Sequence, residues 1–440
     1  MRKNRSDRPS VVAARRRGAV WARMTSAKRW FLFAIITAIF FHITGSTFNS
    51  IGVVLPYMID DLSWSWTEAG TGFSLMALMV GLAGTVPAWT LRKFGVKATF
   101  GIGGAVMALG FSLLALTTGL YQYFIGIALL GVGYALCGTV PAIHMINHWM
   151  PNRRSFAIGA YMTIGGFGGV LGPLFVIGIM SLTGSWRIHW WVMVASILFL
   201  ALLAVLFVKS EPVNGLDSAK KSKRDDATSS SKVHTTEISW RYRDVLRTPQ
   251  YYVIVAAMVI TLFCSITMNS WAVTHMGTLG ISSTVAAGAL SAQAAVNAVS
   301  RALGGALATH IDPKWLIVSA LFAGFMGMLA LAVADNIIAI SLFALGQGYG
   351  FGMCLFATTV LLLNYFGPDE NPEILGTLHL ITTIGMIGPV LGGYIGDTFG
   401  GFAAVFQSYS VILLVILVAV AMMRPPEHRG TEQAKSGFAE

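Results

Sequence analysis

Residues 159–173 read GAYMTIGGFGGVLGP, and residues 376–389 read GTLHLITTIGMIGP. The offset from Gly159 to Gly376 equals the offset from Gly168 to Gly385, and each stretch ends in Gly-Pro. A second pair, AWTLRKFGVK at 88–97 and GALATHIDPK at 305–314, lies at the same offset, and both members close with Lys. Two separate matches at one offset predict that the chain is built from two homologous halves.

The composition places both halves in a bilayer. Hydrophobic residues make up 55% of the 440 positions and charged residues only 11%, which is too apolar for a soluble fold. A membrane-spanning helix needs about 20 consecutive, mostly apolar residues. Such windows occur near 30–57, 67–90, 97–118, 121–147, 155–181, 188–208, 250–276, 283–309, 315–334, 337–366, 373–398 and 402–423. We expect an all-α integral membrane protein with twelve transmembrane helices in two six-helix bundles.

The polar run GLDSAKKSKRDDATSSSK marks the boundary between the halves. The expected organisation is a basic tail (1–29), a first bundle (30–208), a linker (209–248), a second bundle (249–424) and a C-terminal tail (425–440). The first apolar run is a full span with no small-residue cleavage site, so we expect an uncleaved N-terminal tail that starts at Met1 or Met24.

Lys and Arg gather on one side of the predicted membrane. That side holds the basic linker together with Arg92, Lys93, Lys97, Arg153, Arg154, Lys314 and Arg424, whereas the loops of the other side hold only Arg187. Because basic loops stay cytoplasmic, both termini are expected in the cytoplasm, with the protein in a cell membrane. The net charge of +11 is then explained by topology and attraction to anionic lipid, and no nucleic-acid partner is expected.

Twelve spans in two halves around a basic linker resemble the major facilitator superfamily. Its loop signature G-x-x-x-D-R-x-G-R-K is met in degenerate form: Arg92 occupies the acidic position, while Lys93, Gly95 and Lys97 match. The second copy keeps only Gly305 and Lys314. The resemblance implies secondary transport by alternating access, without a prosthetic cofactor and in a fold that works as a monomer.

A closer resemblance covers residues 131–169, which are similar to the monocarboxylate transporter and oxalate/formate antiporter group. The matching positions are Pro141, Trp149, Arg153, Arg154 and residues 157–159. In monocarboxylate transporters the eighth span carries an acidic residue four positions before an Arg, and that Arg is held to bind the substrate carboxylate. Here the pair is Asn297 and Arg301, so proton symport through the acid cannot be carried over intact.

Arg301 is the principal candidate for binding substrate. A charged side chain near the bilayer centre costs about 2.5–3.5 kcal/mol on insertion scales, so it should face a cavity and pair with an anion. Its planar guanidinium matches a carboxylate bidentately, and Asn297 lies one turn away on the same face. The alternative that Arg301 extends to the cytoplasmic surface stays open.

In the superfamily the first, fourth, seventh and tenth helices line the central cavity. Their polar residues add further predicted substrate-binding residues: His42, Asn49, Tyr134, Asn269, Gln347 and Tyr349. Histidine is the natural proton carrier where no carboxylate is available, which makes His42, His144 and His379 candidates for proton coupling. Gating or packing roles are expected for Gly168, Gly172, Pro173, Gly385, Gly388, Pro389, Arg92 and Lys93.

The function predicted from the sequence is secondary transport of a small organic anion, a monocarboxylate or an aromatic acid, with protons as the coupling ion. The alternative is export of drugs or metabolites by proton antiport. It is favoured by an antiporter-like fifth span, in which Val176 stands where the last Gly is expected. An enzyme is not expected, because the chain has no HExxH, GxSxG or GxxxxGK[ST] motif. The three cysteines fall inside spans, so no metal site is expected.

Overall fold

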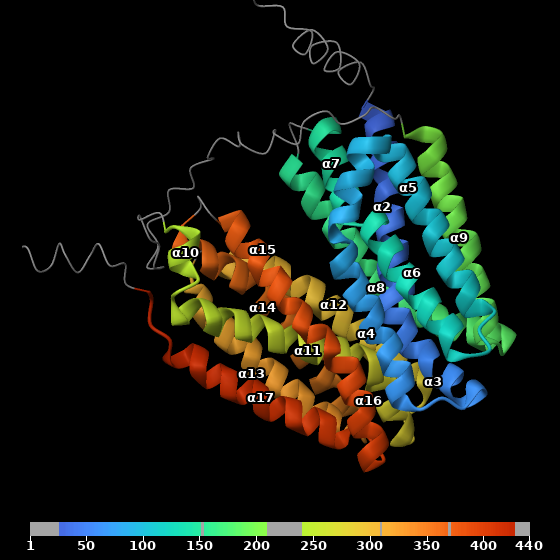
Figure 1. Ribbon diagram of the computed structural model, residues 1–440. Helices are drawn as coiled ribbons and strands as arrows, with labels where there is room; N and C mark the ends of the chain where they lie inside the picture. The colour runs from blue at the N-terminus through green and yellow to red at the C-terminus, as the bar shows by residue number, and fades with distance from the viewer. Residues whose placement is uncertain (1–25, 151–153, 209–239, 309, 368–370, 427–440) are drawn as a thin grey trace, which may run out of the picture.

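The computed structural model describes residues 26–150, 154–208, 240–308, 310–367 and 371–426 (Figure 1). This part of the chain is helical and contains no β-strand. Most of the expected tails, 1–29 and 425–440, and most of the expected linker, 209–248, lie outside the described residues, so these domain boundaries stay predictions.

In the described residues, the first half contains eight α-helices. They are α2 (Ser26–Thr44), α3 (Ser50–Leu62), α4 (Trp66–Leu82), α5 (Val86–Ala115), α6 (Leu120–Cys137), α7 (Thr139–Trp149), α8 (Arg154–Thr183) and α9 (Trp186–Phe207).

The second half follows a short helix, α10 (Tyr242–Val245). Its helices are α11 (Pro249–Thr278), α12 (Ser283–Leu307), α13 (Pro313–Ala332), α14 (Ile337–Phe366), α15 (Asn371–Thr382), α16 (Gly388–Phe399) and α17 (Ala403–Met422).

These helices confirm the predicted fold class. Among the described residues, ten helical segments are long and apolar enough to cross a membrane. One of them, Trp66–Ala115, contains two of the expected spans, which are separated where the backbone turns at Gly95 with φ of 79°. A positive φ is accessible to glycine at little cost. The eighth expected span forms the 25-residue helix α12, which carries Gln, Asn, Ser and Arg residues and is not among these ten segments.

Four of the expected spans are interrupted in the described residues, the second span by a 3₁₀ segment, Ala83–Thr85, between α4 and α5. The first has a π-helical segment, Gly45–Asn49, between α2 and α3. The fourth breaks at Gly138, whose carbonyl accepts a hydrogen bond from the Tyr161 hydroxyl at 3.2 Å. In the eleventh, a 3₁₀ segment, Thr383–Ile387, separates α15 from α16. Discontinuous helices of this kind form substrate sites in secondary transporters, because the freed backbone groups can line a cavity.

The repeated Gly-rich stretches pack in equivalent ways in the two halves. In the fifth span, a Cβ at Gly168 would overlap the carbonyl oxygen of Phe41, so this helix lies directly on the first span. In the eleventh span, a Cβ at Gly385 would lie 3.0 Å from the carbonyl oxygen of Val259 in α11. Gly172 and Gly388 make similar close approaches to the same partner helices. Small residues therefore hold the fifth span on the first and the eleventh on the seventh.

The two prolines of this repeat act differently. Helix α8 runs without interruption through Pro173, whereas the eleventh span is interrupted immediately before the Gly388-Pro389 pair.

The halves meet at one end of the molecule, where α4 lies beside α16 and α3 beside α11, and the far ends marked by α7 and α15 lie apart (Figure 1). Asp397 of α16 accepts hydrogen bonds from the backbone N–H of Trp66 (3.1 Å) and Thr67 (2.8 Å) at the start of α4. The backbone N–H of Val390 donates to Ser74 Oγ at 3.2 Å. This end is therefore closed by hydrogen bonds between the halves.

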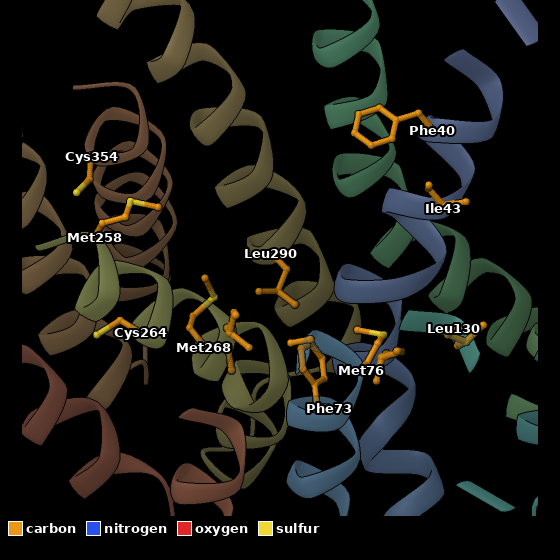
Figure 2. Packing of buried hydrophobic residues seen from close by; sticks show 14 of the residues in the cluster. Phe40, Ile43, Phe73, Met76, Leu130, Met258, Cys264, Met268, Leu290 and Cys354 are labelled. Carbon is orange, nitrogen blue, oxygen red and sulfur yellow. The ribbon is translucent and has the colours of Figure 1, made fainter. Parts of the chain in front are cut away.

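Buried apolar side chains continue across the same junction. Figure 2 shows Phe73 and Met76 of α4 near Met268 of α11 and Leu290 of α12, and all four are fully buried. The core thus includes side chains from both halves. The cavity between the halves lies on the side of this core toward α7 and α15.

We predict that Gly168→Ala destabilises the protein by about 1–3 kcal/mol, because its methyl group would force the fifth span away from the first. Gly159→Ala is the matched control, since nothing lies within 4 Å of a Cβ built at Gly159. Thermal unfolding of the purified protein in detergent should show a lower midpoint for Gly168→Ala only. Equal midpoints for the two variants would contradict the close packing.

Candidate functional site

A cavity of about 550 Å³ lies between the two halves. It is lined by the first, fourth and fifth spans of the first half and by the seventh, eighth, tenth and eleventh spans of the second. The predicted residues that line it are Asn49, Tyr134, Asn269, Asn297 and Arg301. Its apolar walls include Phe40, Phe48, Met162, Leu262, Ile266, Phe351 and Met386.

One face of α12 provides the polar stripe of the cavity. Gln293, Asn297 and Arg301 follow one another at four-residue intervals, so they project from the same side of the helix. Gln293 is only 2% exposed, Asn297 is half-buried and Arg301 is exposed. The cavity therefore deepens from Arg301 toward Gln293, and its mouth lies at the C-terminal end of α12.

Arg301 has no carboxylate partner among the described residues. Its guanidinium carbon lies 5.7 Å from the ring centre of Phe351 on α14, close enough for a cation–π contact. Tyr134 of the first half is near enough to interact with it electrostatically. Arg301 is the only charged side chain among the described residues that line the cavity. The site consequently carries one uncompensated positive charge.

Two asparagines of the second half, Asn269 on α11 and Asn297 on α12, present hydrogen-bond donors to the cavity that Arg301 also lines. Oδ1 of Asn269 and Oδ1 of Asn297 are covered by protein and have no hydrogen-bond partner. The oxygen of Asn297 faces the close contact between α12 and Gly352 of α14. Because the oxygen ends are covered, the NH₂ groups are the ends of these amides left to face the cavity. A cation flanked by amide N–H groups is suited to bind an anion.

The first half brings Asn49 and Tyr134 to the same cavity. Asn49 ends the π-helical segment Gly45–Asn49, and its amide lies against the backbone of Gly169 in α8. Tyr134 lies in the last turn of α6, just before the break at Gly138. π-Helical turns are rare and often occur at functional sites. Both residues therefore lie where the helix of their span is interrupted.

Three other predicted binding residues lie away from the cavity. Gln347 donates to the carbonyl oxygen of Gly324 at 2.7 Å, and the hydroxyl of Tyr349 lies 2.8 Å from Ser319 Oγ, so both connect α14 to α13. His42 Nε2 lies 2.6 Å from Ser196 Oγ on α9. These side chains sit at helix contacts inside one half.

The remaining predicted residues are also outside the lining. His144 lies in α7 and is half-buried, and His379 is exposed on α15. Arg92 and Lys93 are exposed, and Lys93 Nζ lies 5.1 Å from the ring centre of Trp89. Within the described residues, no group of three or more His, Cys, Asp or Glu side chains comes together to hold a metal ion.

Several lining residues were missed by the sequence reasoning. They are Thr44, Phe48, Thr163, Ser265, Gln293 and Phe351. Gln293 could have been found, because it extends the four-residue spacing of Asn297 and Arg301 by one turn. The others give no comparable signal, since Thr, Ser and Phe are ordinary residues of membrane helices.

The comparisons with known proteins agree with this architecture. The family model of the Major Facilitator Superfamily matches residues 31–363 and 255–439. The chain belongs to this superfamily. It is 24% identical to the hexuronate transporter of Bacillus subtilis (strain 168), over 86% of this chain and 90% of that protein. It is also 24% identical to the oxalate:formate antiporter of Oxalobacter formigenes, over 85% of this chain and 91% of that protein.

A solved structure has the same fold. It is a bacterial homolog of the human lysosomal transporter Spinster in an inward-facing and occupied conformation, with a TM-score of 0.72, 17% identity and coverage of 90% of this chain and 96% of that chain. The predicted resemblance to the superfamily, and within it to the oxalate/formate antiporter group, is thereby confirmed.

The depth of the cavity can be tested with two matched alanines of α12. Ala302 lies beside Arg301 and is exposed, whereas Ala294 lies beside Gln293 and is 9% exposed. We predict that Ala302→Cys reacts several-fold faster than Ala294→Cys with a water-soluble maleimide. The three native cysteines are buried and give a low background. Equal rates, or faster labelling of Ala294→Cys, would contradict a mouth at the Arg301 end.

Proposed function

We propose that this superfamily member is a secondary transporter that moves a small organic anion with one carboxylate by alternating access. The observation that supports it is the exposed guanidinium of Arg301, without an acidic partner in the described residues, in a cavity between the two halves. A cation within a membrane-spanning bundle needs a counter-charge even where water reaches it, and here a substrate carboxylate can supply it.

The chemistry of the site favours a carboxylate. Guanidinium presents two parallel N–H donors that match the two oxygens of a carboxylate, and hydrogen bonds between charged groups are the stronger kind. The NH₂ groups of Asn269 and Asn297 can add donors to the same anion or to its neighbouring atoms. The names of the two relatives refer to hexuronate, oxalate and formate, which are all carboxylates. These names support a carboxylate as the substrate group that binds Arg301.

The direction of the cavity fits alternating access. We propose that both termini are cytoplasmic and that the protein works as a monomer in the cell membrane. The cavity mouth, at the C-terminal end of α12, then lies on the same side as Lys314 at the start of α13 and opens inward. The hydrogen bonds between α4 and α16 close the opposite end. If the mouth of the cavity closed and the end at α4 and α16 opened, the substrate would be carried across the membrane.

Proton-antiport export of drugs or metabolites has less support. The described lining residues include no acidic side chain that would attract a cationic drug, and their one charged side chain, Arg301, favours an anion. An organic anion would instead pair with Arg301, the only charged side chain of the described lining.

The proposal predicts that Arg301→Gln lowers uptake of labelled carboxylates into proteoliposomes. The lost charge-assisted hydrogen bonds are worth about 1.5–3 kcal/mol, which corresponds to roughly a tenfold to hundredfold loss in apparent affinity. The panel contains lactate, pyruvate, benzoate, oxalate and glucuronate. Arg187→Gln is the control, because Arg187 is paired with Asp61 at 2.7 Å on the surface of the first half.

Two results would overturn the anion proposal. One is the absence of uptake of every acid by folded wild-type protein. The other is a transported acid whose apparent affinity is the same in wild type and Arg301→Gln.

We further propose that protons couple to transport through His42, with His144 and His379 as the other candidates. His42 is held between α2 and α9 by Ser196 and lies 3.5 Å from Ser46 Oγ, one turn along its own span. His42→Gln should abolish accumulation driven by a proton gradient and leave substrate exchange without a gradient intact. His310→Gln, on an exposed turn, is the control. Normal gradient-driven accumulation by His42→Gln would remove His42 from the mechanism.

A further inference from the structure

The cavity contains more polar side chains than a carboxylate alone can use. The two oxygens of a carboxylate offer about four acceptor sites. Arg301 and Asn297 can occupy most of them from one face of α12. The other polar lining residues are Thr44, Asn49, Tyr134, Thr163, Ser265, Asn269 and Gln293.

Two of these additional polar groups, those of Gln293 and Asn49, lie deeper than the charge. Gln293 is eight residues before Arg301 on the same helix face, a separation of about 12 Å along the axis. Asn49, only 9% exposed, adds an amide from the first half. The side chains of Gln293 and Asn49 make no hydrogen bond within the described residues, and neither has a covered polar atom without a partner. Their amides therefore remain available to a ligand.

The charge count limits the ligand to one carboxylate. Arg301 is the only charged side chain of the described lining, so a second carboxylate at the deep end would meet only neutral groups. Neutral amides and hydroxyls both donate and accept hydrogen bonds, which is the pattern that a substrate hydroxyl needs.

An acid without hydroxyl groups would leave these amides unpaired. A polar group that loses water on binding and finds no partner costs about 1–3 kcal/mol. A site built to hydrogen-bond a hydroxyl therefore discriminates strongly against the analogue that lacks it. The rings of Phe48 and Phe351 leave apolar surface for the C–H faces of the same ligand.

We infer that the substrate is a polyhydroxylated monocarboxylate of the sugar-acid class. Its carboxylate binds Arg301, and its hydroxyl groups reach Gln293 of the second half and Asn49 of the first. This inference rests on the proposed anion-transport function. A ligand that touches both amides also connects the two halves, so the hydroxylated end takes part in the closure of the cavity around it.

The test compares two acids of equal charge and similar size. Glucuronate and cyclohexanecarboxylate each have a six-membered ring and one carboxylate, but only glucuronate has hydroxyl groups. Equilibrium binding to the purified protein is measured by titration calorimetry, which avoids the passive permeation of the apolar acid. Wild type should bind glucuronate at least about tenfold more tightly. Gln293→Met and Asn49→Leu should each reduce this preference, by weakening the binding of glucuronate and by strengthening that of cyclohexanecarboxylate, which no longer leaves an amide unpaired.

Gln407→Met, on the exposed face of α17, is the matched control and should keep the wild-type preference. Equal or tighter binding of cyclohexanecarboxylate by wild type, lost in Arg301→Gln, would overturn the sugar-acid inference while the anion proposal stands. Binding of both acids that is unaffected by Arg301→Gln, or no binding of either acid together with no uptake of any carboxylate, would overturn both. A preference for glucuronate that survives in Gln293→Met and in Asn49→Leu would overturn the assignment of the hydroxyl contacts.

Discussion

The guanidinium of Arg301, which has no acidic partner in the part of the chain that the structure describes, constrains the structure around it. A charge in the hydrocarbon layer is stable only where water or a counter-ion can reach it, so Arg301 requires an open cavity between the halves. The helix that carries it is correspondingly polar and is covered by α8 and α14 on its sides. The open cavity and the proposed carboxylate ligand both follow from placing that charge on α12.

Small residues make such a cavity compatible with a tightly packed protein. Gly168 and Gly172 let the fifth span lie against the first, and Gly385 and Gly388 do the same for the eleventh and seventh. Close backbone contacts hold these helices together, because apolar side chains gain little by leaving lipid tails that are equally apolar. Because the helices of each half pack closely, we expect each half to move as a unit relative to the other.

Much of this architecture could be predicted from the sequence, because hydropathy and the repeat both act over long stretches. Asn49, Tyr134 and Asn269 lie at the cavity on the first, fourth and seventh spans, which were expected to line it, whereas Asn297 and Arg301 line it from the eighth. Gln347 and Tyr349 are on one such helix but face α13. Depth along a helix can be counted from the sequence, whereas its rotation depends on packing against neighbours. The π-helical segment that ends at Asn49 changes the rotation of the first span about its axis. No residue type in the sequence marks this backbone adjustment.

The contact between Asp397 and the start of α4 has a consequence for the speed of the cycle. Helix α4 already has its own cap, because Ser65 and Glu68 bond reciprocally at its first turn. Release of Asp397 therefore leaves α4 intact, and water can replace its hydrogen bonds because the carboxylate is exposed. The enthalpy of the closed and separated forms then differs little at this point. Exposed hydrogen bonds such as those of Asp397 are expected to keep the barrier to separation of the halves low. A buried ion pair at the same place would raise it, because its charges would lose their partner before water could reach them.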